Sequence, residues 1–146
     1  MNTVKDILKH KGTDVWTITP EDTIFNALNM MKEKNVGAVV VVGIKGNVEG
    51  IFSERDFVRY CAAKDMLNIL HIPIKEVMTP KVICVDEDQT IDNCMALMTD
   101  KRLRHLPVLD KEQLIGLISI GDVVKAMQHE KDILIDQLEH YITGSL

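Results

Sequence analysis

A short polar motif occurs twice, each time between an apolar run and a stretch with helical periodicity. Its glycine, serine and aspartate are Gly50, Ser53 and Asp56 in the first copy and Gly116, Ser119 and Asp122 in the second. The glycine lets a ligand approach the backbone. The serine hydroxyl and the free amides of a helix start can bind an anion, and a carboxylate can accept hydrogen bonds from both hydroxyls of a ribose. The two copies therefore predict two nucleotide sites.

The same residues also have a purely structural interpretation. Asp56 and Asp122 can be helix N-caps, with Ser53 and Ser119 as local turn residues. Capping alone would accept Ser, Thr, Asn or Asp at either position, whereas the same serine and the same aspartate recur. The recurrence favours ligand binding.

Basic residues precede a predicted strand only in the second half of the chain. Arg104 offers forked donors that suit phosphate oxygens, and His105 adds a weaker, pH-sensitive donor. Because neighbouring strand residues point to opposite faces, these two side chains could serve different clefts. The matching place in the first half holds Val36 and Gly37 with no basic group. We therefore expect two unequal clefts, although a solvated basic patch is an alternative for the second half.

The elements that must position these motifs also recur. Each half begins with an extended stretch, followed by a helix that Asp22 or Asp88 can cap. The extended stretches are Val15–Ile18 and Val82–Val85, and the strand pairs that follow each helix are Ala38–Val42 with Val48–Phe52 and Leu106–Leu109 with Leu114–Ile118. The order β-α-β-β-α therefore occurs twice. One such unit is too small to be stable alone, so we expect an α/β (α+β) fold in which two repeats pack sheet to sheet as a pseudo-two-fold pair.

The repeats divide the chain into four parts. We place the first repeat at 4–62, a linker at 63–76, the second repeat at 77–128 and a C-terminal helical tail at 129–146. In the tail region, Met127, Leu134, Leu138 and Tyr141 run at helical spacing before Gly144, a typical helix stop. We expect this helix to pack against a dimer mate, against a partner protein or against its own chain. Small ligands would bind in the clefts between the repeats.

Composition excludes several classes of function. The net charge of -5 argues against binding to nucleic acid or anionic membranes. The apolar run Ala38–Val42 is far shorter than the roughly 20 residues of a membrane span, and the polar N-terminus predicts a cytoplasmic protein. The three cysteines, Cys61, Cys84 and Cys94, form no metal or disulfide pattern. Catalytic motifs are also missing, so we predict that the chain is no enzyme.

Together these features resemble the CBS-domain family, in its tandem form known as the Bateman module. The resemblance covers about residues 4 to 128. It depends on the two glycine, serine and aspartate motifs and on two further runs, Val77-Met78-Thr79-Pro80 and Arg104-His105-Leu106-Pro107-Val108.

The resemblance implies a site in each of two clefts, with a ribose on Asp56 or Asp122 and phosphates near Ser53 or Ser119. The Asp122 cleft would also contain Thr13, Asp14, Val36, Gly37, Leu117 and Arg104. The Asp56 cleft would contain Ile51, Arg55, Thr79, Val82, Leu103 and His105. The apolar members would enclose adenine.

The family binds AMP, ADP, ATP, NAD or S-adenosylmethionine, and the basic pair favours AMP, with NAD next. The resemblance also implies a homodimer that regulates a separate protein in response to its ligand. The alternatives are a structural module that oligomerises without a ligand, and an RNA-binding protein that uses Lys101, Arg102 and Arg104.

Overall fold

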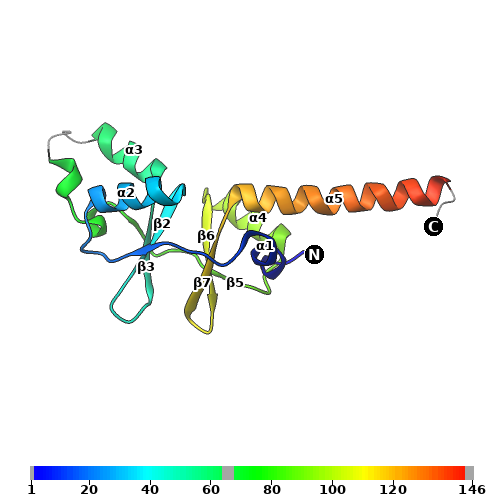
Figure 1. Cartoon of the computed structure of the whole chain (residues 1–146), viewed down its shortest axis with the longest axis horizontal. Helices are drawn as coiled ribbons and strands as arrows, with labels where there is room; N and C mark the ends of the chain where they lie inside the picture. The colour runs from blue at the N-terminus through cyan, green and yellow to red at the C-terminus, as the bar shows by residue number, and fades with distance from the viewer. Residues whose placement is uncertain (1, 64–67, 144–146) are drawn as a thin grey trace.

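The computed structural model describes residues 2–63 and 68–143, which form two small sheets flanked by helices (Figure 1). The sheet orders are β1-β2-β3-β4 and β5-β6-β7. Strand β1 is parallel to β2 and β5 is parallel to β6, whereas the other neighbouring strands of both sheets are antiparallel. The strands are β1 Thr17–Ile18, β2 Ala38–Val42, β3 Val48–Ser53, β4 Thr79–Pro80, β5 Val85–Asp86, β6 His105–Asp110 and β7 Gln113–Ser119.

Five α-helices and two 3-10 turns complete the described part of the chain. They are α1 Val4–Lys11, α2 Ile24–Lys34, α3 Glu54–Ala63, η1 Ile69–His71, η2 Ile74–Glu76, α4 Ile91–Asp100 and α5 Ile120–Thr143. The predicted order β-α-β-β-α is therefore present in both halves, and the α/β prediction is confirmed. Three helical elements were not predicted. Helix α1 precedes the first strand of the first repeat, and the turns η1 and η2 precede the second repeat.

Strand alternation explains why the two sheets pack on each other. Successive side chains of a strand point to opposite faces, so Val39 and Val41 pack in the core of their own repeat. Ala38 and Val40 point the other way and cluster with Leu117 of β7. This shared cluster joins the two sheets, which confirms the predicted sheet-to-sheet pair.

The strands differ from the prediction in their length and number. The stretches predicted at Val15–Ile18 and Val82–Val85 contain only the two-residue strands β1 and β5. The unpredicted strand β4 pairs with β3 at the edge of the first sheet, where Pro80 is tolerated because an edge strand needs fewer donors.

Asp22 and Asp88 are not the N-caps of α2 and α4, so that prediction is wrong. The caps are Thr23 and Thr90, whose hydroxyls accept from the amides of Asn26 and Asn93 at 3.2 and 3.1 Å. Both threonines have the extended backbone of a cap residue.

The hydrophobic cores exchange segments between the repeats. Helix α1 lies at the start of the first repeat, before its first strand, but Val4, Ile7 and Leu8 are 0%, 5% and 6% exposed in the core cluster of the second. The residues before the second repeat do the reverse, because Ile69 and Ile74 lie in the core cluster of the first. We call residues 2–11, which include α1, and residues 69–78 the exchange segments.

Backbone hydrogen bonds fasten both exchange segments in the same way. The first amide of α2, on Ile24, donates to the Ile72 carbonyl at 2.9 Å, and the first amide of α4, on Ile91, donates to the Asn2 carbonyl at 2.8 Å. A helix start leaves such amides without an internal partner, so each exchange segment satisfies a donor of the repeat it completes. The predicted boundaries at 4–62 and 77–128 thus follow the repeats of the sequence. The hydrophobic core of each repeat also contains residues from outside its own boundaries. Part of the linker predicted at 63–76, residues 64–67, lies outside the described residues.

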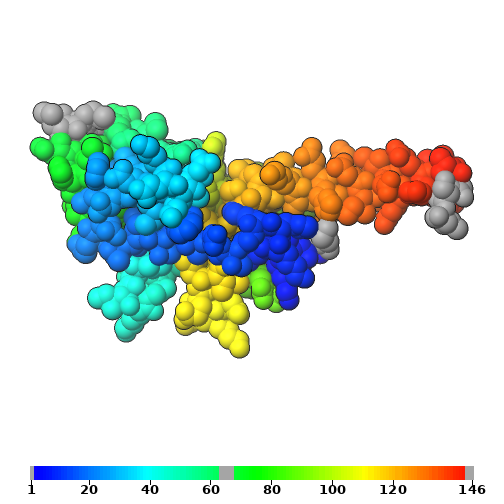
Figure 2. All heavy atoms as spheres, viewed as in Figure 1, coloured from blue at the N-terminus to red at the C-terminus, as the bar shows by residue number. Residues whose placement is uncertain are grey.

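Helix α5 runs without a break from the second repeat into the predicted tail at 129–146. No glycine or proline interrupts residues 122–143, so the second helix of the repeat and the tail are one element as far as Thr143. Its distal part projects beyond the body of the molecule (Figures 1 and 2). There Leu134, Leu138 and Tyr141 are 55%, 51% and 85% exposed. Gly144, predicted as the stop, lies outside the described residues.

Replacing Leu8 by alanine tests the segment exchange. Leu8 approaches Gly116 of β7 closely, since a Cβ there would lie 2.8 Å from a Leu8 methyl carbon. Because the truncation leaves a cavity in the core, we expect the free energy of unfolding to fall by about 2–5 kcal/mol, measured by urea denaturation. The control is Lys9→Ala, at an exposed position of the same helix. Equal stability of the two variants would contradict the packing of α1.

Candidate functional site

Each motif serine and aspartate form a reciprocal cap at a helix start. In the first repeat the Ser53 amide and hydroxyl donate to Oδ2 of Asp56 at 2.9 and 3.0 Å, and the Asp56 amide donates to Ser53 Oγ at 3.3 Å. Ser119 and Asp122 repeat this pattern, at 2.7 Å to the carboxylate and 3.2 Å to the hydroxyl. The capping interpretation is thus correct in kind, but the serine precedes each helix and the aspartate is its third residue.

Capping occupies only one oxygen of each carboxylate. On Asp56, the other oxygen, Oδ1, accepts from the Thr79 hydroxyl at 3.2 Å. On Asp122, Oδ1 has no hydrogen-bond donor among residues 2–63 and 68–143. Each aspartate can therefore cap its helix and still present acceptor sites to a ligand.

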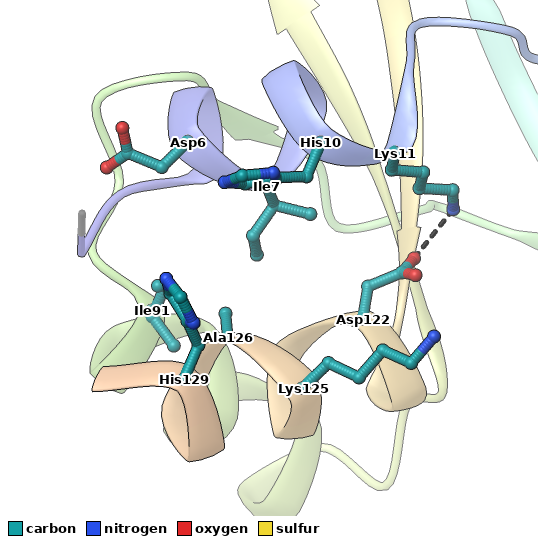
Figure 3. A pocket seen from close by; sticks show the side chains of 9 residues that line it. All are labelled: Asp6, Ile7, His10, Lys11, Ile91, Asp122, Lys125, Ala126 and His129. Atoms are coloured by element: carbon teal, nitrogen blue, oxygen red, sulfur yellow. Dashed lines mark hydrogen bonds and ion pairs between the residues drawn. The ribbon is translucent and has the colours of Figure 1, made fainter. Parts of the chain in front are cut away.

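Lys11 is a site residue that sequence reasoning missed. Its Nζ lies 2.6 Å from Oδ2 of Asp122 and 2.6 Å from the Leu117 carbonyl oxygen. Figure 3 shows the ion pair between the end of α1 and the start of α5. Lys11 belongs to no motif, and the only available signal was its place two residues before Thr13 and three before Asp14.

The ion pair keeps Asp122 charged. Burial favours the neutral carboxyl, but the hydrogen bonds from Lys11 and from the Ser119 amide outweigh burial, and the pKa of Asp122 lies below its usual value. The Lys11 and Asp122 side chains are 34% and 21% exposed. The contact is therefore partly screened by solvent, and a ligand can compete for it.

A pocket of about 400 Å³ opens beside this ion pair, between α1 and α5 (Figure 3). Its walls are Asp6, Ile7, His10, Lys11, Ile91, Asp122, Lys125, Ala126 and His129. Asp122 is the only predicted site residue among them. The His10 and His129 rings meet edge to face, with centroids 6.1 Å apart.

The structure divides the other predicted site residues between several places. Ile51 and Leu117 belong to the apolar cluster between the sheets. Val36 packs against the core of the first repeat and Leu103 against that of the second. Arg55 lies on α3, in a shallow hollow away from the sheets' common cluster.

Backbone hydrogen bonds place two of the remaining predicted residues, Arg104 and Gly37, at helix starts. The Arg104 carbonyl accepts from the first amide of α5 at 2.9 Å, and the Gly37 carbonyl accepts from the first amide of α3 at 3.1 Å. Each residue therefore lies at the helix start of its own repeat, Arg104 with Asp122 and Gly37 with Asp56. Thr13 and Asp14 are exposed just after α1, and Val82 is half-buried.

His105 lies where the charges of both motifs act on it. Burial lowers its pKa below the ordinary value, and the positive charge of Lys11 lowers it further against the opposing charge of Asp122. Arg104 and Asp56 add a smaller pair of opposite effects. His105 was predicted to serve the Asp56 cleft, but both carboxylates influence it. The neutral imidazole is favoured in the folded protein.

The described residues offer little for metal binding or thiolate chemistry. In residues 2–63 and 68–143, no three His, Cys, Asp or Glu side chains form a group that could hold a metal ion. Burial raises the pKa of Cys94 to about 11, so its thiolate is strongly disfavoured. No described helix has the length and apolar content needed to cross a bilayer.

The lowered pKa of His105 predicts a pH-dependent stability. The unfolded chain takes up a proton on this imidazole near pH 6.5, whereas the folded chain does so only at lower pH. Stability is therefore full above about pH 6.5 and falls as the pH drops below it. We expect His105→Gln to reduce the loss of unfolding free energy between about pH 7.5 and about pH 5 in urea titrations. An equally steep loss in the variant would contradict this role.

Comparison with known proteins gives a consistent result. A family model described as CBS domain matches residues 3–63 and 74–129. The mitochondrial CBS domain-containing protein CBSX3 of Arabidopsis thaliana is 36% identical over 151 residues, which cover 97% of this chain and 72% of that protein.

Solved structures have the same architecture. The CBS-domain containing protein ATU1752 from Agrobacterium tumefaciens is similar with a TM-score of 0.81 and 42% identity, over 86% of this chain and 98% of that one. CBSX2, solved in complex with AMP, gives a TM-score of 0.70 at 23% identity, over 90% and 99% of the two chains. At that identity the second likeness shows the fold alone.

Proposed function

Because this chain belongs to the CBS-domain family, we propose that it is a regulatory module that binds an adenine nucleotide between its repeats. The observation that carries the proposal is the pair of capped carboxylates. Asp56 and Asp122 each complete a helix cap through Oδ2, and Oδ1 keeps at least one acceptor site on Asp56, beside the Thr79 hydroxyl, and both on Asp122. A ribose diol donates two hydrogen bonds to such a group.

The ligand we propose is AMP, with NAD, ADP, ATP and S-adenosylmethionine as the alternatives. Ile51 and Leu117 supply apolar surface between the sheets for adenine. Lys11 supplies a cation on Asp122 for a phosphate. Arg104, whose backbone carbonyl meets the first amide of α5, is the second cation that we propose for it. The AMP complex of the structurally similar CBSX2 supports an adenosyl ligand without deciding among these alternatives.

The proposal assigns no reaction to the chain, and ligand binding would act on another protein. A change in the clefts can reach a partner through the dimer geometry or through α5, which begins at the Asp122 motif. We propose a homodimer, which agrees with the exposed apolar residues on the distal part of α5. A cytoplasmic location also remains our prediction, and the relative CBSX3 is mitochondrial.

Two alternatives remain, a structural module without a ligand and an RNA-binding protein. The first predicts oligomerisation that nucleotides do not change. RNA binding would have to overcome the net charge of -5, and it would weaken steeply with salt.

A thermal-shift screen tests the nucleotide proposal. We expect AMP to raise the melting temperature of the wild-type protein, because a ligand that binds only the folded state stabilises it. The screen compares AMP, ADP, ATP, NAD, NADH and S-adenosylmethionine. If none of them shifts the melting temperature, the protein does not bind adenine nucleotides and the proposal fails.

The matched variants Asp122→Asn and Asp56→Asn test which cleft dominates. Both substitutions keep the size of the side chain and remove the charge. We expect Asp122→Asn to remove more of the AMP-induced shift, because Lys11 contacts Asp122 and the backbone of Arg104 meets the start of the same helix. Equal losses in the two variants would show that the clefts contribute equally.

A further inference from the structure

The contact between Lys11 and Asp122 uses one of the two carboxylate oxygens that a ribose diol can engage. Oδ2 of Asp122 already accepts from the Ser119 amide at 2.7 Å and from Lys11 at 2.6 Å. A carboxylate oxygen has two lone pairs, so Oδ2 is saturated. A ribose diol that engages both carboxylate oxygens must therefore displace the Lys11 ammonium. The displacement would also free the Leu117 carbonyl, the second acceptor of Lys11.

A ribose that displaces Lys11 from Asp122 leaves the Lys11 ammonium without its anionic partner. A ribose is neutral, so it replaces the hydrogen bonds of Lys11 to Asp122 without replacing the charge. The lysine side chain is a flexible point charge at the last position of α1, and it remains beside the cleft after it moves. A phosphate on the ligand supplies the missing anion, whereas uncharged adenosine supplies none and cationic S-adenosylmethionine adds repulsion.

The first repeat lacks this arrangement. Met78 holds the equivalent position, since Met78 follows the buried Ile74 by four residues as Lys11 follows the buried Ile7. Its side chain packs against Gly50, where a Cβ would lie 2.4 Å from the sulfur. Within the described part of the chain, Asp56 receives only neutral donors, from Ser53 and Thr79. No described cation therefore contacts the Asp56 carboxylate as Lys11 contacts Asp122.

We propose that Lys11 is a specificity-determining residue of the Asp122 cleft. A ligand's ribose displaces its ammonium from Asp122, and the ammonium then pairs with the ligand's phosphate. The cleft thereby selects phosphorylated adenosyl ligands over adenosine and S-adenosylmethionine. This inference rests on the proposed nucleotide function and deepens it.

Isothermal titration of Lys11→Met with AMP and with adenosine tests the inference. Asp56→Asn serves as the background, so that the Asp122 cleft dominates the signal. Methionine keeps the apolar stem and is the residue at the equivalent position of the first repeat. We expect adenosine to bind more tightly and AMP more weakly, so that the ratio of their affinities falls by about tenfold or more.

Matched variants separate charge from packing. Lys9→Met changes an exposed lysine on the same helix and should keep the wild-type ratio. Lys11→Arg keeps the charge and should retain most of the preference for AMP. An unchanged ratio in Lys11→Met, with AMP still bound, would overturn the role of Lys11 alone. Absence of binding by the wild type and all variants would overturn the proposed function, and this inference with it.

Discussion

The exchange of segments between the repeats is the constraint on which the rest of the molecule depends. Each repeat has its own sheet and helices, but its core is closed by residues that precede the other repeat. Ile74 is fully buried in the first core and Val4 in the second. A repeat without its exchange segment would expose this apolar surface and leave helix-start amides unpaired. The pair therefore folds as one unit.

The same exchange builds the candidate site. Helix α1 docks on the second repeat and ends at Lys11, which reaches Asp122. The other exchange segment docks on the first repeat and leads to Thr79, which reaches Asp56. Both carboxylates thus receive a partner from a segment delivered by core packing. The difference between an ammonium and a hydroxyl at these two places makes the two carboxylates chemically unequal.

Local sequence patterns predicted the repeated architecture well because helices and strands depend mainly on residues that are close together in the chain. The spacing of Ile24, Ala27 and Met31 indicates a helix, and the valine run of β2 indicates a strand covered on both faces. The recurring serine and aspartate located both helix starts. The docking of α1 depends on contacts between residues more than 80 positions apart, as between Val4 and Gln89. No local period encodes such a contact, so Lys11 could not be placed from the sequence.

The length of helix α5 determines how far its tip would move if the helix tilted at its base. At about 1.5 Å per residue, Thr143 lies about 31 Å along the helix from Asp122. A tilt of about 10° at the base of such a rod would displace its tip by about 5 Å. The uninterrupted helix would therefore magnify any small change of angle at its base into a larger displacement at its tip.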